Sequence, residues 1–159
     1  MRSFLLQPYP FSEDLSKKLL VYGGIGLFIA LFLALFEPFG FDELSTTIKW
    51  SHASLFGAVT FIISSFFQAI VPKIFPRHFS EEGWQSWKEI LYLVVTTGFI
   101  GAGNYWLMLY LYQQNAAFTS FLRAELITLQ VGIFPILFIV FMKPLNLYKL
   151  YAEKAVVAF

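Results

Sequence analysis

Four long runs of apolar residues, separated by short polar segments, make up most of the chain. They cover residues 19–36, 51–71, 90–112 and 124–142. Each approaches or exceeds the roughly 20 residues that a helix needs to cross a hydrocarbon core about 30 Å thick. Backbone polar groups in lipid must be satisfied within the segment, so the runs predict helices. The pattern therefore predicts an all-α integral membrane bundle of four transmembrane helices.

The lysines and arginines alternate in number from one polar segment to the next. Residues 1–18, the loop between the second and third runs, and residues 143–159 carry three each, whereas the other two loops carry one each, which accounts for all 11. Cytoplasmic flanks of membrane proteins are enriched in these residues. We therefore expect both termini and the middle loop in the cytoplasm, around a transmembrane domain of residues 19–142.

Composition agrees with a membrane protein and leaves little material for chemistry. Hydrophobic residues make up 58% of the chain and charged residues 13%, whereas soluble domains carry about 25% charged residues. Cysteine is absent, and the two histidines, His52 and His78, fall on opposite sides of the membrane in this topology. We expect no enzyme activity, no cofactor and no metal site.

Two polar segments carry helical patterns of their own. Ser80 followed by Glu81 and Glu82 is typical of a helix start, and Trp84, Trp87 and Leu91 recur at helical spacing. They predict a short amphipathic helix at the inner interface, where tryptophan is favoured. Residues 143–159 predict a cytoplasmic helix that leaves the membrane.

Polar side chains inside the spans are the first candidates for a functional site. The sequence offers Asn104 and Gln130 deep in their helices, Gln68 near an inner end, and Glu125 near an outer boundary. Amides in such positions commonly form hydrogen bonds between helices, and Glu125 has the alternatives of an interfacial carboxylate or a proton or cation site. We name all four as possible sensing residues, with packing as the alternative for the amides.

Small residues recur at four-residue spacing on three of the predicted helices. Such stripes allow helices to approach closely, within one chain or between two chains. Pro135 predicts a kink in the fourth helix. The stripes are Gly26, Ala30 and Ala34 on the first helix, Ala53 and Gly57 on the second, and Gly98 and Ala102 on the third.

Several short motifs resemble the N-terminal membrane region of bacterial LytTR-type transcriptional regulators, in order and spacing over nearly the whole chain. They are Gln7-Pro8-Tyr9-Pro10-Phe11, Glu37-Pro38-Phe39-Gly40, Phe75-Pro76, Phe79-Ser80-Glu81-Glu82-Gly83-Trp84, Lys88-Glu89-Ile90 and Val131-Gly132-Ile133-Phe134-Pro135.

The resemblance implies a multi-pass protein of the bacterial cytoplasmic membrane that serves as a sensory or anchoring module. In that family a cytoplasmic LytTR domain of DNA-binding function follows the four helices, and these 159 residues do not include it. We expect a homodimer in the lipid bilayer, responding to an unidentified signal or partner membrane protein, with DNA contacted only through the absent domain. A small transporter acting as a dimer and the membrane half of a sensor histidine kinase remain as alternatives.

Overall fold

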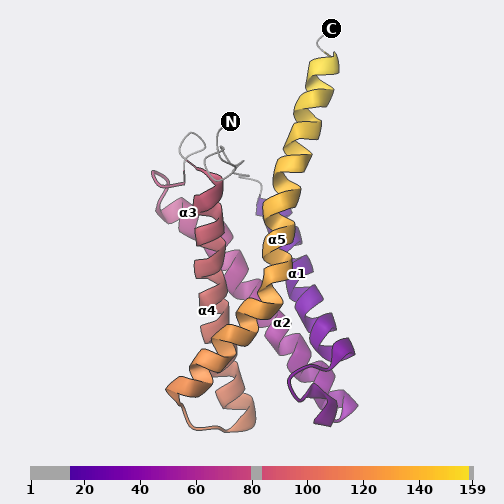
Figure 1. Cartoon of the computed structure of the whole chain (residues 1–159), viewed down its shortest axis with the longest axis vertical. Coiled ribbons are helices and arrows are strands. Elements are labelled where there is room, and N and C mark those ends of the chain that lie inside the picture. Colours follow the sequence, from indigo (N-terminus) through magenta and orange to yellow (C-terminus); the bar gives the residue numbers. More distant parts are fainter. Residues whose placement is uncertain (1–14, 80–83, 158–159) are drawn as a thin grey trace.

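The structure, a computed structural model, describes residues 15–79 and 84–157, with side chains described as far as Phe141. Its long helices are α1 (Leu15–Phe36), α2 (Thr46–Ala69), α4 (Ser86–Tyr112) and α5 (Phe118–Val157), and its short ones are η2 (Phe41–Glu43) and α3 (Val71–Ile74) (Figure 1). No strand occurs in the described ranges. Each long helix contains a stretch that is long and apolar enough to cross a membrane. The all-α fold and the four helices of spanning length are therefore confirmed.

The helices extend beyond the apolar runs that predicted them. α1 begins four residues earlier than residue 19, α2 five residues earlier than residue 51, and α5 six residues earlier than residue 124. Polar residues in these added turns continue the helix because a helix satisfies its own backbone groups on either side of the membrane surface. α2 ends at Ala69, and the single turn α3 follows with Pro72 in its first positions. Proline lacks the N–H group that a first helical turn leaves unpaired, so it suits this place.

Two predicted helices are joined to their neighbours. Trp87 and Leu91 belong to the first turns of α4, which starts at Ser86 after the extended residue Gln85. Ser80, which was expected to start a separate amphipathic helix, lies outside the described residues. At the other end of the chain, residues 143–157 continue α5 without interruption. The boundary expected after residue 142 is thus not a break in secondary structure.

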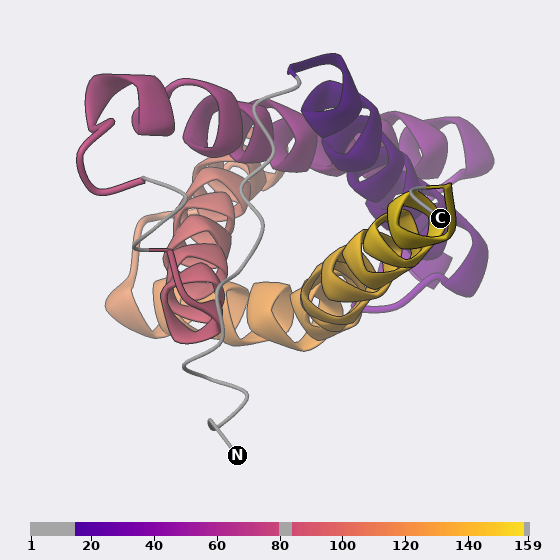
Figure 2. The ribbon, with the colours of Figure 1, turned by 90° about the horizontal axis from the view of Figure 1, so that it is seen from above.

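The four long helices form a ring in the order α1, α2, α4, α5 (Figure 2). α1 packs along α2, α2 also packs on α4, and α4 packs on α5. The start of α1, α3, the start of α4 and the far end of α5 lie at one end of the bundle, which we call the terminal end (Figure 1). η2 and the turn between α4 and α5 lie at the other, which we call the hairpin end.

The outer surface of the bundle is apolar. Leu20 is 79% exposed, and Trp106 and Phe134 are each 68% exposed. In water these side chains would expose a large continuous apolar surface, which soluble monomers avoid. The ring is therefore built to face lipid, and the chain is a multi-pass membrane protein.

Candidate functional site: a cavity inside the helix ring

A cavity of about 510 Å³ lies between the four long helices and reaches the hairpin end. All four helices line it, as does the segment around η2. Its wall on α1 is formed by Tyr22, Ile25, Ile29 and Leu33, which recur at three- and four-residue spacing and so share one face of the helix. On α5 the lining runs from Ala124 to Ile139. One face of each long helix therefore lines the cavity.

The threonines in the cavity wall contribute less polarity than their side chains suggest. The hydroxyl groups of Thr60, Thr96 and Thr97 donate to carbonyl oxygens of their own helices, four residues earlier, at 3.0, 2.8 and 2.8 Å. This bond consumes the only donor of each hydroxyl group. The methyl carbon of Thr97 faces Gly132 of α5. It lies 3.2 Å from the position that a Cβ atom at Gly132 would take. The middle of the cavity is therefore largely apolar.

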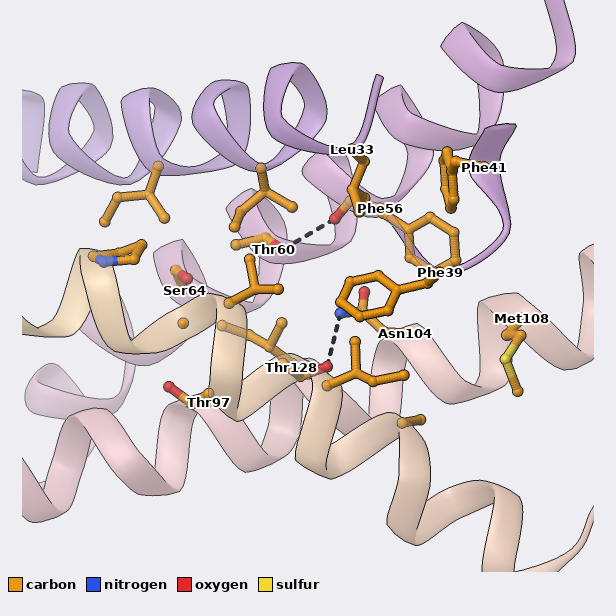
Figure 3. Close-up of a pocket in the computed structure, with 18 of the residues that line it drawn as sticks. Leu33, Phe39, Phe41, Phe56, Thr60, Ser64, Thr97, Asn104, Met108 and Thr128 are labelled. Carbon is orange, nitrogen blue, oxygen red and sulfur yellow. Dashed lines mark hydrogen bonds between the residues drawn. The ribbon is translucent and has the colours of Figure 1, made fainter. Parts of the chain in front are cut away.

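Asn104 is the polar exception. Its Nδ2 atom donates to the Thr128 hydroxyl across the α4–α5 interface at 3.4 Å, a long hydrogen bond (Figure 3). Its Oδ1 atom is buried and has no hydrogen-bond partner among the described residues. Because an unpaired buried acceptor costs roughly 1–3 kcal/mol, this amide is the strongest candidate in the cavity for a contact with a bound molecule.

The segment between α1 and η2 forms the mouth of the cavity. Phe39 projects from it into the cavity toward Asn104 (Figure 3). Glu37 and Phe39 have φ angles of 53° and 62°, in a region that side chains with a Cβ atom rarely adopt. An ion pair between Glu37 and Lys49 fixes one side of the segment, and the buried ring of Phe41 fixes the other against Phe56. The strained backbone therefore holds an aromatic ring over the cavity.

Glu125, expected near the outer boundary, lies seven residues, about two turns, after the start of α5. Its carboxyl group packs against Gly101, where an added Cβ atom would come within 2.4 Å of Oε2. Gly101 precedes the end of α4 by 11 residues, or about 16 Å of helix. The Oε1 atom is buried without a hydrogen-bond partner among the described residues. Glu125 does not line the cavity, although its contact with Gly101 lies one turn along the α4–α5 interface from the bond between Asn104 and Thr128.

The other two amides lie apart from the cavity. Gln130 is exposed on α5 and faces outward. Gln68 is buried near the terminal end of α2, where its backbone oxygen accepts a hydrogen bond from Lys18 Nζ at 3.0 Å. Its Nε2 atom has no partner among the described residues. Of the four candidate sensing residues, the cavity includes Asn104 alone.

Glu89 is a buried carboxylate that sequence reasoning missed. It fell within the amphipathic helix predicted for the middle loop and was not named as a candidate, whereas in the structure Glu89 occupies the first turn of α4. The side chain is only 2% exposed and accepts a hydrogen bond from Trp84 Nε1 at 2.8 Å. The rings of Phe79 and Tyr92 pack around that indole. The helix-start position of Glu89, three residues after a serine, was the available signal.

The small-residue stripes differ in where they lie. A Cβ atom at Gly26 would come within 2.7 Å of the Gly57 carbonyl oxygen, and one at Gly57 within 2.9 Å of the Ala30 Cβ atom. Ala34 and Ala53 are buried in the same α1–α2 interface. At Gly98, by contrast, an added Cβ atom would meet nothing within 4 Å, and the tightly packed glycines of α4 are Gly101 and Gly103. Ala102, the other residue of that stripe, is only partly buried.

Pro135 lines the cavity, and α5 changes direction partway along its length (Figure 1). The helix continues through this residue without a break. Proline removes one backbone hydrogen bond and crowds the preceding turn, which bends a helix. A bend produced by Pro135 would lie beside the cavity.

Comparison of the chain with models of known families, with curated protein sequences and with solved structures finds no match. The histidines do not form a metal site: His52 lies at the hairpin end against Tyr112, and His78 at the terminal end against Phe75. Within the described ranges, no three histidine or acidic side chains gather in a way that could hold a metal ion.

Proposed function

We propose that the chain is the membrane-embedded sensory module of a LytTR-type transcriptional regulator in the bacterial cytoplasmic membrane. One observation carries the proposal: α5 lines the cavity from Ala124 to Ile139 and then continues as the same helix to Val157. A change in the cavity wall is thereby connected mechanically to the terminal end of the bundle. The motif resemblance supplies the identity of the domain that this helix would move.

The mechanism is a change in the tilt or rotation of α5. From Ile139 to Val157 the helix extends by 18 residues, about 27 Å. A continuous helix is stiff over this distance, so a small rotation at Pro135 becomes a larger displacement at the far end. α5 packs most extensively on α4, and it shares with α1 a buried cluster that contains Tyr22, Ile139 and Val140.

The charge pattern supports a cytoplasmic terminal end. Lys17, Lys18, Lys73 and Arg77 all belong to that end of the bundle, whereas η2 at the hairpin end carries two acidic residues. Lysine and arginine are retained on the cytoplasmic side of membrane proteins. We also propose that the module forms a homodimer in the bacterial cytoplasmic membrane.

The experiment tests helical phase between cavity and output. In cells that carry the native gene, one alanine is inserted between Lys149 and Leu150, and seven residues in a second strain. One residue turns everything beyond it by about 100°, whereas seven leave the phase within roughly 20°. Transcript profiling should show a changed response with one residue and a nearly native response with seven.

A one-residue insertion between Asn115 and Ala116, in the turn at the hairpin end, is the matched control and should preserve the response. If deletion of the native gene changes no transcripts, the regulator proposal fails. Equal effects of the one- and seven-residue insertions would rule out transmission through a continuous helix.

The transporter alternative gains no support from the geometry. It relies on Glu125, which packs against Gly101 outside the cavity lining. Proton-coupled flux in proteoliposomes that is lost on Glu125→Gln would restore it. A sensor histidine kinase would share this membrane geometry and differ in its output, so phosphoryl transfer from ATP by the native protein would replace the transcriptional proposal.

A further inference from the structure

We propose that the central cavity binds an uncharged lipophilic alcohol, with its hydroxyl group donating to Asn104 Oδ1 and its apolar body lying between α1, α4 and α5. The inference deepens the proposed function, because it names the chemical class of the signal. It rests on that function only for the claim that binding alters output.

The size and lining of the cavity select an apolar molecule. Its volume of about 510 Å³ falls within the roughly 300–1,000 Å³ of small-molecule sites. Ile25, Ile29, Ile100 and Val131 contribute to a wall that is mainly hydrocarbon. The hydroxyl groups of Thr60, Thr96 and Thr97 in that wall already donate to their own helices. A molecule of this size therefore gains most by burying apolar surface.

Charge excludes ionised ligands from the interior. Among the residues that the structure describes, no lysine, arginine or histidine lines the cavity, and the one carboxylate in its lining, Glu43, belongs to η2 at the mouth. An anion would be buried without a counter-charge, and a cation would find its only partner at the hairpin end. Burying an unpaired charge costs far more than an apolar wall returns. The ligand is therefore neutral over the part that enters.

Asn104 requires a hydrogen-bond donor. The Thr128 hydroxyl occupies the Nδ2 side of the amide, while Oδ1 is buried and unpaired. A hydroxyl group supplies the missing donor, whereas an ether, ester or ketone supplies only acceptors. A single water molecule is a poorer solution, because a buried water needs two to four polar partners and most of the cavity lining is apolar. Among neutral oxygen-containing groups, these observations favour an alcohol.

The experiment uses a photoreactive probe on the full chain in lipid nanodiscs. The probe is a ten-carbon primary alcohol with a diazirine in the middle of the chain, and its methyl ether is the matched probe without a donor. After irradiation, mass spectrometry locates the adducts. The alcohol should label residues that line the cavity, excess 1-decanol should compete with it, and the ether should label roughly 3- to 10-fold less at equal concentration, as loss of one buried hydrogen bond predicts.

Two substitutions test the assignment of the contact. Asn104→Leu should lower labelling by the alcohol by roughly 3- to 10-fold and abolish its advantage over the ether. Gln130→Leu is the matched control, since Gln130 is an exposed amide on a spanning helix, and it should change nothing. If Asn104→Leu does not fold, Ala124→Phe fills the cavity without removing the amide and should likewise suppress labelling.

Equal labelling by alcohol and ether, or adducts confined to lipid-facing residues such as Phe134 and Phe138, would overturn the proposal. The labelling needs no downstream domain, so its failure is distinct from failure of the proposed function. A phase-dependent transcript response without alcohol labelling would retain the sensory module and reject this ligand class.

Discussion

The α1–α2 crossing provides the sharpest test of the packing, because two glycines of α1 differ only in what they face. A Cβ atom at Gly26 would lie 2.7 Å from the Gly57 carbonyl oxygen and 3.0 Å from the Phe61 Cβ atom. One at Gly24, two residues away on the same helix, would meet nothing within 4 Å. We therefore expect Gly26→Ala to destabilise the bundle and Gly24→Ala to leave it unchanged or stabilise it.

The size of the effect follows from these distances. Carbon atoms in good contact lie about 3.5–4.0 Å apart, so an alanine at Gly26 forces the two helices apart by roughly 0.5–1 Å. The neighbouring atoms include backbone, which cannot rotate away. Overpacking of this kind costs about 1–3 kcal/mol, and the gain from replacing a helical glycine is about 0.5–1 kcal/mol. The net loss for Gly26→Ala is therefore about 0–2.5 kcal/mol.

The assay is unfolding in mixed micelles by titration with sodium dodecyl sulfate, followed by circular dichroism and by tryptophan fluorescence. Gly24→Ala controls for the glycine-to-alanine change itself, and Gly98→Ala, which also meets open space, repeats that control on α4. Equal free energies of unfolding for Gly26→Ala and Gly24→Ala would refute the α1–α2 interface described above.

Three further predictions follow from other contacts. Glu89→Ala removes the buried acceptor of the Trp84 indole N–H group, so the free energy of unfolding should fall by about 2–3 kcal/mol. Glu89→Gln keeps an acceptor and should lose less. An unchanged free energy of unfolding for Glu89→Ala would contradict the buried hydrogen bond. Gly101→Val should cost about 1–3 kcal/mol by displacing the Glu125 carboxyl group, and Glu125→Ala should relieve part of that cost in a double-mutant cycle; strict additivity would refute the contact. The chain has no cysteine of its own, so Asp42→Cys should react with a membrane-impermeant maleimide in intact cells and Lys73→Cys only after permeabilisation; the reverse pattern would invert the topology.

The spanning helices could be predicted because lipid imposes a strong requirement on the sequence. A segment that crosses the bilayer must be apolar for about 20 residues, and the four runs carry that signal directly. The ends of the helices were harder to predict from the sequence, since polar residues on either side of an apolar run can continue the helix into the interface. Glu89 was not named as a candidate for this reason: it belongs to the first turn of α4, although it precedes the apolar run.

The site depended on information that spacing does not contain. Asn104 was selected as an intramembrane amide, but its bond to Thr128 depends on the register of α4 against α5. In the predicted stripe of Gly98 and Ala102, Gly98 makes no close contact within the chain, whereas Gly101 and Gly103 of the same helix do. In a helix that is apolar all round, the hydrophobic pattern does not distinguish a neighbouring helix from lipid. The cavity itself arises only when four faces are brought together.

The central claim is that this membrane module belongs to a protein that regulates transcription from the bacterial membrane. Chromatin immunoprecipitation of the native full-length protein, carrying an epitope tag and expressed from its own locus, tests it most directly. The account predicts discrete enriched DNA sites that are recovered with the membrane fraction and are absent from an untagged strain. Enrichment no greater than in the untagged strain, with the tagged protein present in the membrane at native levels, would contradict it.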